Sequence, residues 1–539
     1  ITTRAGNFKR FSCKVEATSI MSVATVEGPL WKPGEDGLAG GSFLFSARHA
    51  YLDAVSESIY SYANDTAGLP FGFTDLYGKL TFGNGASYAS LFGYHQRDQV
   101  DYGFPSSVAW TQSGGGLNFQ FLPNNTRMIL TGALGISNFR NELLNPDERF
   151  PRESGITGFN GRLNFAYAIG KADEFSYGIQ LNGFSNDLTI TNSLGLQTEN
   201  QGSNTEFAGY FTYKKAFQRQ QMQPDGTIEF FTRAIIEPSV RIHYYNDQNQ
   251  VMLEPRLRAK LNFDRVSFQA SAGRYSQNLI TAVSDRDVVQ LFQAYLAAPN
   301  QSVANQQIDD HFLQVATHVV GGVQVELFPG LTTEVEGWFK NFEQVTNINR
   351  QRLFPTDEQF LVETGQAYGV DFILKYQVRK LYLYATYGWA RVTRDDGQQT
   401  YNPVFDRRHN VNFVGNYRIG QLRAKDDGRP LSSKWEIGTR FQLGSGFPFT
   451  QTQGFFEKLT IDDSDAADLI TQNGQLGILL SQDLNGGRLP YYHRFDVSFK
   501  RRFRLGNAMI LEGNVNAINV YNRANIFYFD RVRYERVDQ

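Results

Sequence analysis

The stretch LEPRLRAKLNF at residues 253–263 decides the fold, because its apolar and polar residues alternate without a break. Leu253 and Leu257 fall on one side of an extended chain, and Arg256 and Arg258 fall on the other. Side chains of a β-strand point alternately to its two faces, so this period of two predicts a strand with one apolar and one charged face.

The same alternation recurs along the chain, most clearly at 174–183, 408–419 and 435–443. The strands of a soluble β-sandwich alternate as well, so alternation alone leaves both classes open. We expect 19 strands between residues 41 and 521, and a further hairpin within residues 8–30 that turns near Ser19 and Ile20.

The lengths of the connections favour a transmembrane barrel. Every second connection is a short turn such as 264–265 or 328–330, with two longer exceptions at 217–226 and 420–433. The connections between these turns are mostly long: 51–70, 141–154, 187–201, 277–310, 344–361 and 447–488. Short periplasmic turns and long extracellular loops are typical of outer-membrane β-barrels. A soluble β-sandwich does not require short and long connections to alternate in this way.

The sequence therefore predicts an all-β fold, a transmembrane antiparallel β-barrel of about 22 strands. The first and last of the 19 strands run in the same direction. Closing the barrel then takes one more strand, which we expect beyond Gln539.

Composition excludes several other classes. Lys and Arg total 52 against 54 Asp and Glu, which gives a net charge of -2. The composition therefore predicts no general basic surface, and we expect no nucleic-acid partner. A single cysteine, Cys13, excludes a disulfide framework. No run approaches the roughly 18 consecutive apolar residues of a membrane-spanning helix. The 44 Phe, 27 Tyr and 50 Gly suit strands that face lipid.

Pieces spread from one end of the chain to the other resemble one family. They are Ile1–Asn7, Glu27–Leu30, Ser42–Arg48, Glu254–Leu257, Gly273–Gln277, Arg407–Asn410, Gly444–Pro448 and Asn519–Arg523. In this order they resemble the barrel domain of TonB-dependent outer-membrane receptors of the kind common in Bacteroidota. The first piece resembles the end of that family's plug domain. The resemblance thus implies that residues 1–7 end a plug or its linker and that residues 8–539 form the barrel.

The resemblance also implies a function. The parent protein would be a receptor in the outer membrane of a Gram-negative cell that takes up a large or scarce nutrient, of the siderophore, cobalamin, glycan or peptide class. Its implied partners are outer-membrane lipid and lipopolysaccharide, and TonB through a plug that precedes this chain. A surface lipoprotein or other subunits of an outer-membrane complex are further candidate partners. Two alternatives stay open: a scaffold barrel in such a complex, and a plugless passive porin.

No residue pattern predicts catalysis or a metal site, and we expect neither an enzyme nor a cofactor. Two sets of residues are candidates for function. Six basic side chains are expected to face the lumen: Arg256, Arg258, Lys260, Arg408, Arg418 and Arg440. Three aromatic residues are assigned to an extracellular loop: Tyr275, Phe292 and Tyr295. Apolar residues between Val288 and Leu296 recur at helical spacing, which predicts a helix in the 277–310 loop. Trp110, Trp389, Trp435 and Tyr177 are expected in interfacial aromatic girdles.

Overall fold

The computed structural model describes most of the chain. The described residues are 3–32, 40–59, 69, 71–83, 86–101, 107–123, 126–144, 152–170, 172–191, 197–222, 228–282, 292, 294–298, 311–349, 356–420, 422–423, 430–432, 435–457, 476–505 and 509–526.

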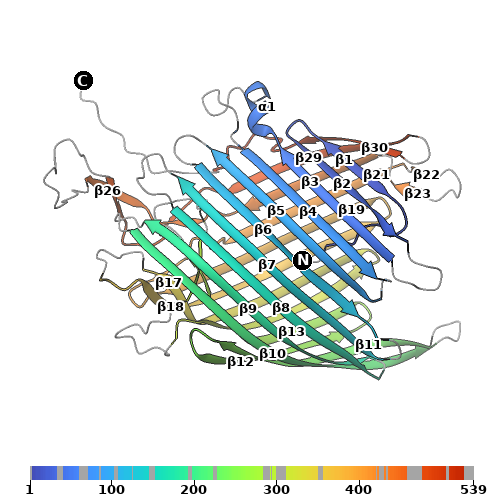
Figure 1. The fold of residues 1–539 in the computed structure, drawn as a ribbon, viewed down its shortest axis with the longest axis horizontal. Coiled ribbons are helices and arrows are strands. Elements are labelled where there is room, and N and C mark those ends of the chain that lie inside the picture. Colours follow the sequence, from blue (N-terminus) through green and yellow to red (C-terminus); the bar gives the residue numbers. More distant parts are fainter. Residues whose placement is uncertain are drawn as a thin grey trace.

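Within the described residues, a single sheet of 22 strands wraps into a barrel (Figure 1). In its first half the strands are β1 (Ser12–Ala17), β2 (Met21–Trp31), β3 (Gly40–Ala50), β4 (Phe71–Gly83), β5 (Tyr88–Asp101), β6 (Ser107–Phe121), β7 (Met128–Leu144), β8 (Arg152–Ile169), β9 (Asp173–Thr191), β10 (Gln197–Met222) and β11 (Ile228–Tyr245). In its second half they are β12 (Gln250–Asn262), β13 (Val266–Gln277), β16 (Gln314–Phe328), β17 (Leu331–Ile348), β18 (Phe360–Val378), β19 (Leu381–Asp395), β20 (Thr400–Tyr401), β21 (His409–Ile419), β24 (Trp435–Gly444), β29 (Tyr492–Leu505) and β30 (Met509–Ala517).

Every strand from β1 to β30 in these two sets, apart from the two-residue β20, pairs antiparallel with the next one along the chain. The predicted all-β antiparallel barrel is therefore confirmed. The predicted hairpin near the start is confirmed as well, because β1 and β2 pair across the turn at residues 18–20. The longer connection expected at 217–226 is wrong, since the β10–β11 ladder continues through a bulge at Phe217 to Met222.

The predicted total of 22 strands is reached differently. The sheet includes β20, which pairs only with the last two residues of β19. Without it, 21 strands follow one another antiparallel, so β1 and β30 run in the same direction. Among the described strands no pairing joins β1 to β30.

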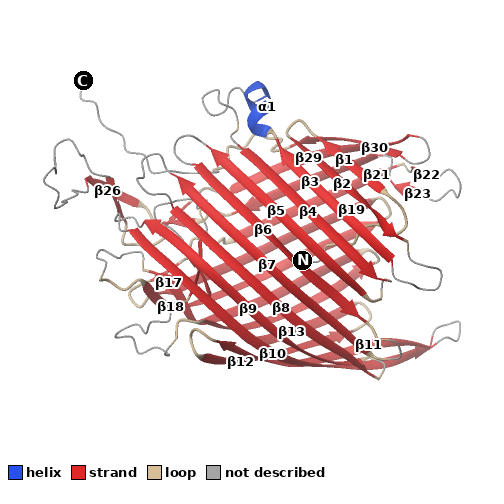
Figure 2. Ribbon diagram, in the orientation of Figure 1, coloured by secondary structure: helices blue, strands red, loops and turns tan. Residues whose placement is uncertain are grey.

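Smaller elements lie in the connections, and Figure 2 shows how little of the described part of the chain is helical. Helix α1 (Leu52–Ile59) follows β3. The short strands pair two by two: β14 (Leu279–Ala282) with β15 (Ala294–Ala297), β22 (Leu422–Arg423) with β23 (Pro430–Ser432), β25 (Pro448–Phe449) with β28 (Gly487–Arg488), and β26 (Thr452–Glu457) with β27 (Leu476–Leu480). Within the described ranges, no helix is long and apolar enough to cross a membrane. We call the end of the barrel that carries α1, β14 and β15 the loop end.

Candidate functional site

Exposure separates the two faces of the sheet. On β12, Leu253, Leu257 and Leu261 are 47–56% exposed, whereas Glu254 between them is 2% exposed. The register carries this division around the barrel, since Glu254 lies opposite Arg241 of β11 and residues directly opposite share a face. The apolar face is therefore the outer surface of the barrel, and the polar face lines its interior.

The basic residues predicted on β12 lie on the interior face. Arg256 donates to Glu254 at 2.6 Å, and its guanidinium lies 4.5 Å from the ring centre of Tyr275. Arg256, Arg258 and Tyr275 line one interior cavity of about 500 Å³. Lys260 lies on the same face, opposite Gln269. The assignment of Tyr275 to a loop is wrong: it belongs to β13, whose ladder with β16 continues to Gln277.

The other three basic residues lie on or directly before β21 and β24, which are far from β12 in the sheet order. Arg418 lies opposite Glu436, with 3.5 Å between Nε and a carboxylate oxygen. Arg440 lies opposite Asp496. Arg408 precedes the first residue of β21 and pairs with Asp406 at 3.0 Å. The six basic residues therefore do not converge on one site.

Two sequence pieces that lie far apart in the chain meet around Asp406. This side chain is 0% exposed, and it accepts hydrogen bonds from the Val392 amide at 2.9 Å and from Arg488 at 2.5 Å, as well as from Arg408. Arg488 also donates to the carbonyl of Gly446 at 3.2 Å. We call these residues the Asp406 cluster. It fastens the β19–β21 connection to the β24–β29 connection.

A hairpin folds into the barrel mouth where a helix was predicted. Tyr295 and Leu296 belong to β15, which pairs with β14, so the predicted helix is wrong at these two residues. Residues 288–291 of the predicted helix lie outside the described residues. The Tyr295 amide donates to Ser154 of β8, and the Ala297 amide donates to Asn186 of β9. The hairpin is therefore fastened across the inner wall of β8 and β9.

An apolar core explains why the hairpin turns inward. Phe292 is 1% exposed and Leu296 is 0% exposed. They pack with inward-facing residues at the strand ends: Val108, Leu143, Leu188 and Ile190. Burial of these side chains outweighs the helical preference of a short segment, whose helix would be marginal in isolation. Trp110 packs against the same core, so its expected place in an outer aromatic girdle is wrong.

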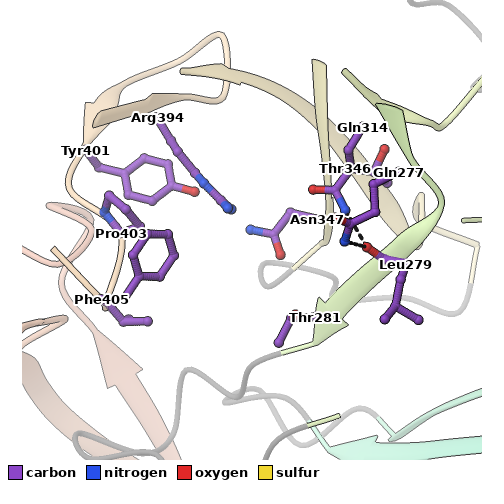
Figure 3. A pocket seen from close by; sticks show the side chains of 11 residues that line it. Gln277, Leu279, Thr281, Gln314, Thr346, Asn347, Arg394, Tyr401, Pro403 and Phe405 are labelled. Carbon is purple, nitrogen blue, oxygen red and sulfur yellow. Dashed lines mark hydrogen bonds between the residues drawn. The ribbon is translucent and has the colours of Figure 1, made fainter. Parts of the chain in front are cut away.

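The opposite side of the hairpin borders a small pocket at the loop end (Figure 3). The pocket has a volume of about 220 Å³ and is lined by Gln277, Leu279, Thr281, Gln314, Thr346, Asn347, Arg394, Tyr401, Pro403, Val404 and Phe405. One wall comes from β13, β14, β16 and β17, and the other from β19, β20 and the segment after β20. Sequence reasoning missed this pocket. Its signal in the sequence is the aromatic pair Tyr401 and Phe405 within a largely polar connection.

The start of the chain runs along the interior wall. Lys79 of β4, 7% exposed, donates from Nζ to the Thr3 carbonyl at 2.8 Å. Thr3 also hydrogen bonds to the Tyr77 hydroxyl at 2.5 Å, and Arg4 pairs with Glu27. At Gly6 a Cβ would lie 2.1 Å from the carbonyl oxygen of Phe43, so the segment is packed directly on the β3 backbone.

Within the part of the chain that the structure describes, no three His, Cys, Asp or Glu side chains are grouped to hold a metal ion. The clusters above are ion pairs and hydrogen bonds around an interior space. A further interior cavity, of about 1240 Å³, is bordered by Thr3 and by strands from β4 to β13. The fold and this polar interior define a wide β-barrel with a polar lumen.

Comparison with solved structures supports that class. The ferric preacinetobactin receptor BauA from Acinetobacter baumannii aligns with a TM-score of 0.60 and 9% identity, over 98% of this chain and 78% of BauA. The FrpB iron transporter from Neisseria meningitidis aligns with a TM-score of 0.58 and 12% identity, over 93% of this chain and 75% of that one. The outer membrane transporter YddB from Escherichia coli aligns with a TM-score of 0.53 and 10% identity, over 93% and 72%. No family model and no curated protein sequence matches this chain. At these identities the likeness shows the fold, which is that of outer-membrane barrel receptors and transporters.

Proposed function

We propose that this chain is the barrel of a TonB-dependent outer-membrane receptor, of the Bacteroidota type, that imports a large or scarce nutrient. The observation that carries the proposal is the path of the first residues. Thr3 to Gly6 lie against the inner wall, held by Lys79 and Glu27, so the chain reaches the first strand from inside the barrel. A segment preceding β1 would then be placed in the lumen.

The width of the barrel supports a lumenal domain. Barrel diameter grows with strand number; porins of roughly 16–18 strands leave aqueous channels, and transporters of about 22 strands have a plugged lumen. The interior here carries Arg256, Arg258 and Glu254, which need water or partners. We therefore propose that residues 1–7 end a plug and that residues 8–539 form the barrel, with a closing strand beyond Gln539 between β1 and β30.

The outer face supports a place in the outer membrane, in contact with its lipid and lipopolysaccharide. Large apolar side chains are exposed there on strand after strand, among them Ile179, Phe207, Ile242, Leu257 and Phe268. The energising partner would be TonB, reached through the plug. A surface lipoprotein and other complex subunits are further proposed partners.

An uptake experiment tests the proposal. The full-length protein is expressed in a Gram-negative strain that lacks its own receptors, and uptake of labelled ferric siderophores, cobalamin, oligosaccharides and peptides is measured. We expect uptake of one class that stops when TonB is deleted. Uptake that persists without TonB would instead indicate a passive porin, and no uptake of any class would favour a scaffold barrel.

A further inference from the structure

The pocket beside the β14–β15 hairpin has walls that select a hydrogen-bond donor. Gln277 and Gln314 both donate from Nε2 to the carbonyl of Leu279, at 2.7 and 2.6 Å. Figure 3 shows both bonds at the right-hand wall. Because the amide nitrogens are used in this way, the two Oε1 atoms are left as acceptors. A group bound against these two Gln side chains therefore donates hydrogen bonds, as hydroxyl groups do.

The pocket carries little net charge. Arg394 is the one charged side chain among the eleven lining residues that the structure describes. Its Nη1 lies 3.5 Å from a carboxylate oxygen of Glu363, and the Glu363 side chain is 0% exposed. Tyr401 donates to that carboxylate, with distances of 2.8 and 2.9 Å to its two oxygens. The guanidinium is thus already balanced by a buried anion, and a polyanionic ligand gains little from it.

An aromatic face completes the pocket. The ring of Phe405 is part of the lining and is 55% exposed, and the Arg394 guanidinium lies 5.6 Å from its centre. Pro403 lies beside it, and Asn347 reaches toward the same space from the opposite wall (Figure 3). A flat apolar surface facing amide and hydroxyl groups suits a ring that has an apolar face and a polar rim.

We propose that this pocket is a subsite for an uncharged, hydroxyl-bearing sugar ring of the imported nutrient. The proposal rests on the proposed function, which it narrows to a saccharide-containing ligand. The volume of about 220 Å³ is below the 300–1,000 Å³ typical of sites for drug-sized ligands, so the pocket holds one ring of a larger molecule. The stacked ring contacts Phe405, and its hydroxyl groups donate to Gln277 and Gln314.

The test uses the purified full-length protein in detergent. Neutral oligosaccharides, acidic oligosaccharides and tripeptides are printed on one array, and the dissociation constant of the best-bound probe is then measured by calorimetry. We expect a neutral oligosaccharide to bind best. Phe405→Ala should weaken it about tenfold, the equivalent of one lost aromatic contact. Its exposed ring makes misfolding of this variant a minor concern, and Asn347→Leu provides a second variant from the opposite wall.

The matched control is Phe372→Ala, which removes a 38% exposed ring from the outer face of β18. Its affinity should equal that of the unmodified protein. Preference for acidic oligosaccharides or peptides, absence of any neutral-sugar binding, or unchanged affinity in both pocket variants would overturn the subsite. The uptake experiment distinguishes failure of the subsite from failure of the proposed function. TonB-dependent uptake that Phe405→Ala leaves unchanged would overturn the subsite, whereas the proposed function would stand.

Discussion

Removal of the Asp406 carboxylate should release two connections at the loop end. Asp406 is completely buried and accepts hydrogen bonds from Val392, Arg408 and Arg488. In Asp406→Ala both guanidinium groups lose their anion. Loss of one partner of a buried ion pair costs about 3–5 kcal/mol. At about 1.4 kcal/mol per tenfold change, the open state of these connections becomes about two to four orders of magnitude more populated.

Trypsin measures this opening directly, because Arg408 and Arg488 of the cluster and the neighbouring Arg407 are cleavage sites. Cleavage tracks the population of the open state when opening and closing are fast. We expect Asp406→Ala to be cut at these sites while the strands stay intact. Asp406→Asn, which keeps the shape and loses the charge, should be intermediate. Asp395→Asn is the control, since Asp395 lies in the same region and bonds to Thr400 at the surface. Equal cleavage of Asp406→Ala and the unmodified protein would refute the reasoning.

Three further predictions concern the wall and the mouth of the barrel. Lys79→Met should speed hydrogen exchange of residues 3–7 by about tenfold or more, because a charge-assisted hydrogen bond to Thr3 is lost. Lys260→Met is the control. Slow exchange of residues 3–7 in both variants would mean that other contacts hold this segment. Leu257→Arg should cost about 2–4 kcal/mol of folding free energy in lipid vesicles, whereas Arg258→Leu on the interior face costs less; equal losses would contradict the assigned faces. Leu296→Asp should detach the hairpin and raise the conductance of the full-length protein in planar bilayers, because Leu296 is 0% exposed in the apolar core that holds the hairpin against the strand ends. Unchanged conductance would show that the hairpin does not narrow the mouth.

Much of the wall could be predicted because each strand shows its two faces in its own sequence. On β12 the alternation of Leu257 and Arg258 assigns the faces without any knowledge of the neighbouring strands. The parity of short and long connections then gives direction and order. Both signals are local, and the strand ladder preserves them over its whole length.

The hairpin at the mouth could not be predicted in this way, because its structure depends on residues far away in the chain. Phe292 and Leu296 are spaced as a helix would need, yet they form the cover of an apolar patch. The patch itself was visible as Val108 and Leu188, apolar residues at positions where the alternation predicts a polar interior. An apolar inward face at a strand end implies a cover, and the following loop with matching apolar residues is the candidate for it.

The pocket was hidden by one irregularity in β17. From Glu334 to Phe342 the inward-facing positions of this strand are even-numbered, as the pairing of Glu336 with Asp371 indicates. The register then shifts between Phe342 and Val345, so Val345 and Asn347 pair with inward-facing positions of β18. A bulge inserts one residue and thereby exchanges the two faces beyond it. With an uninterrupted period of two, Asn347 would lie on the outer face, and its side chain would not point across the pocket toward Arg394 (Figure 3). The chemistry of this site thus depends on a break in the pattern that identifies the fold.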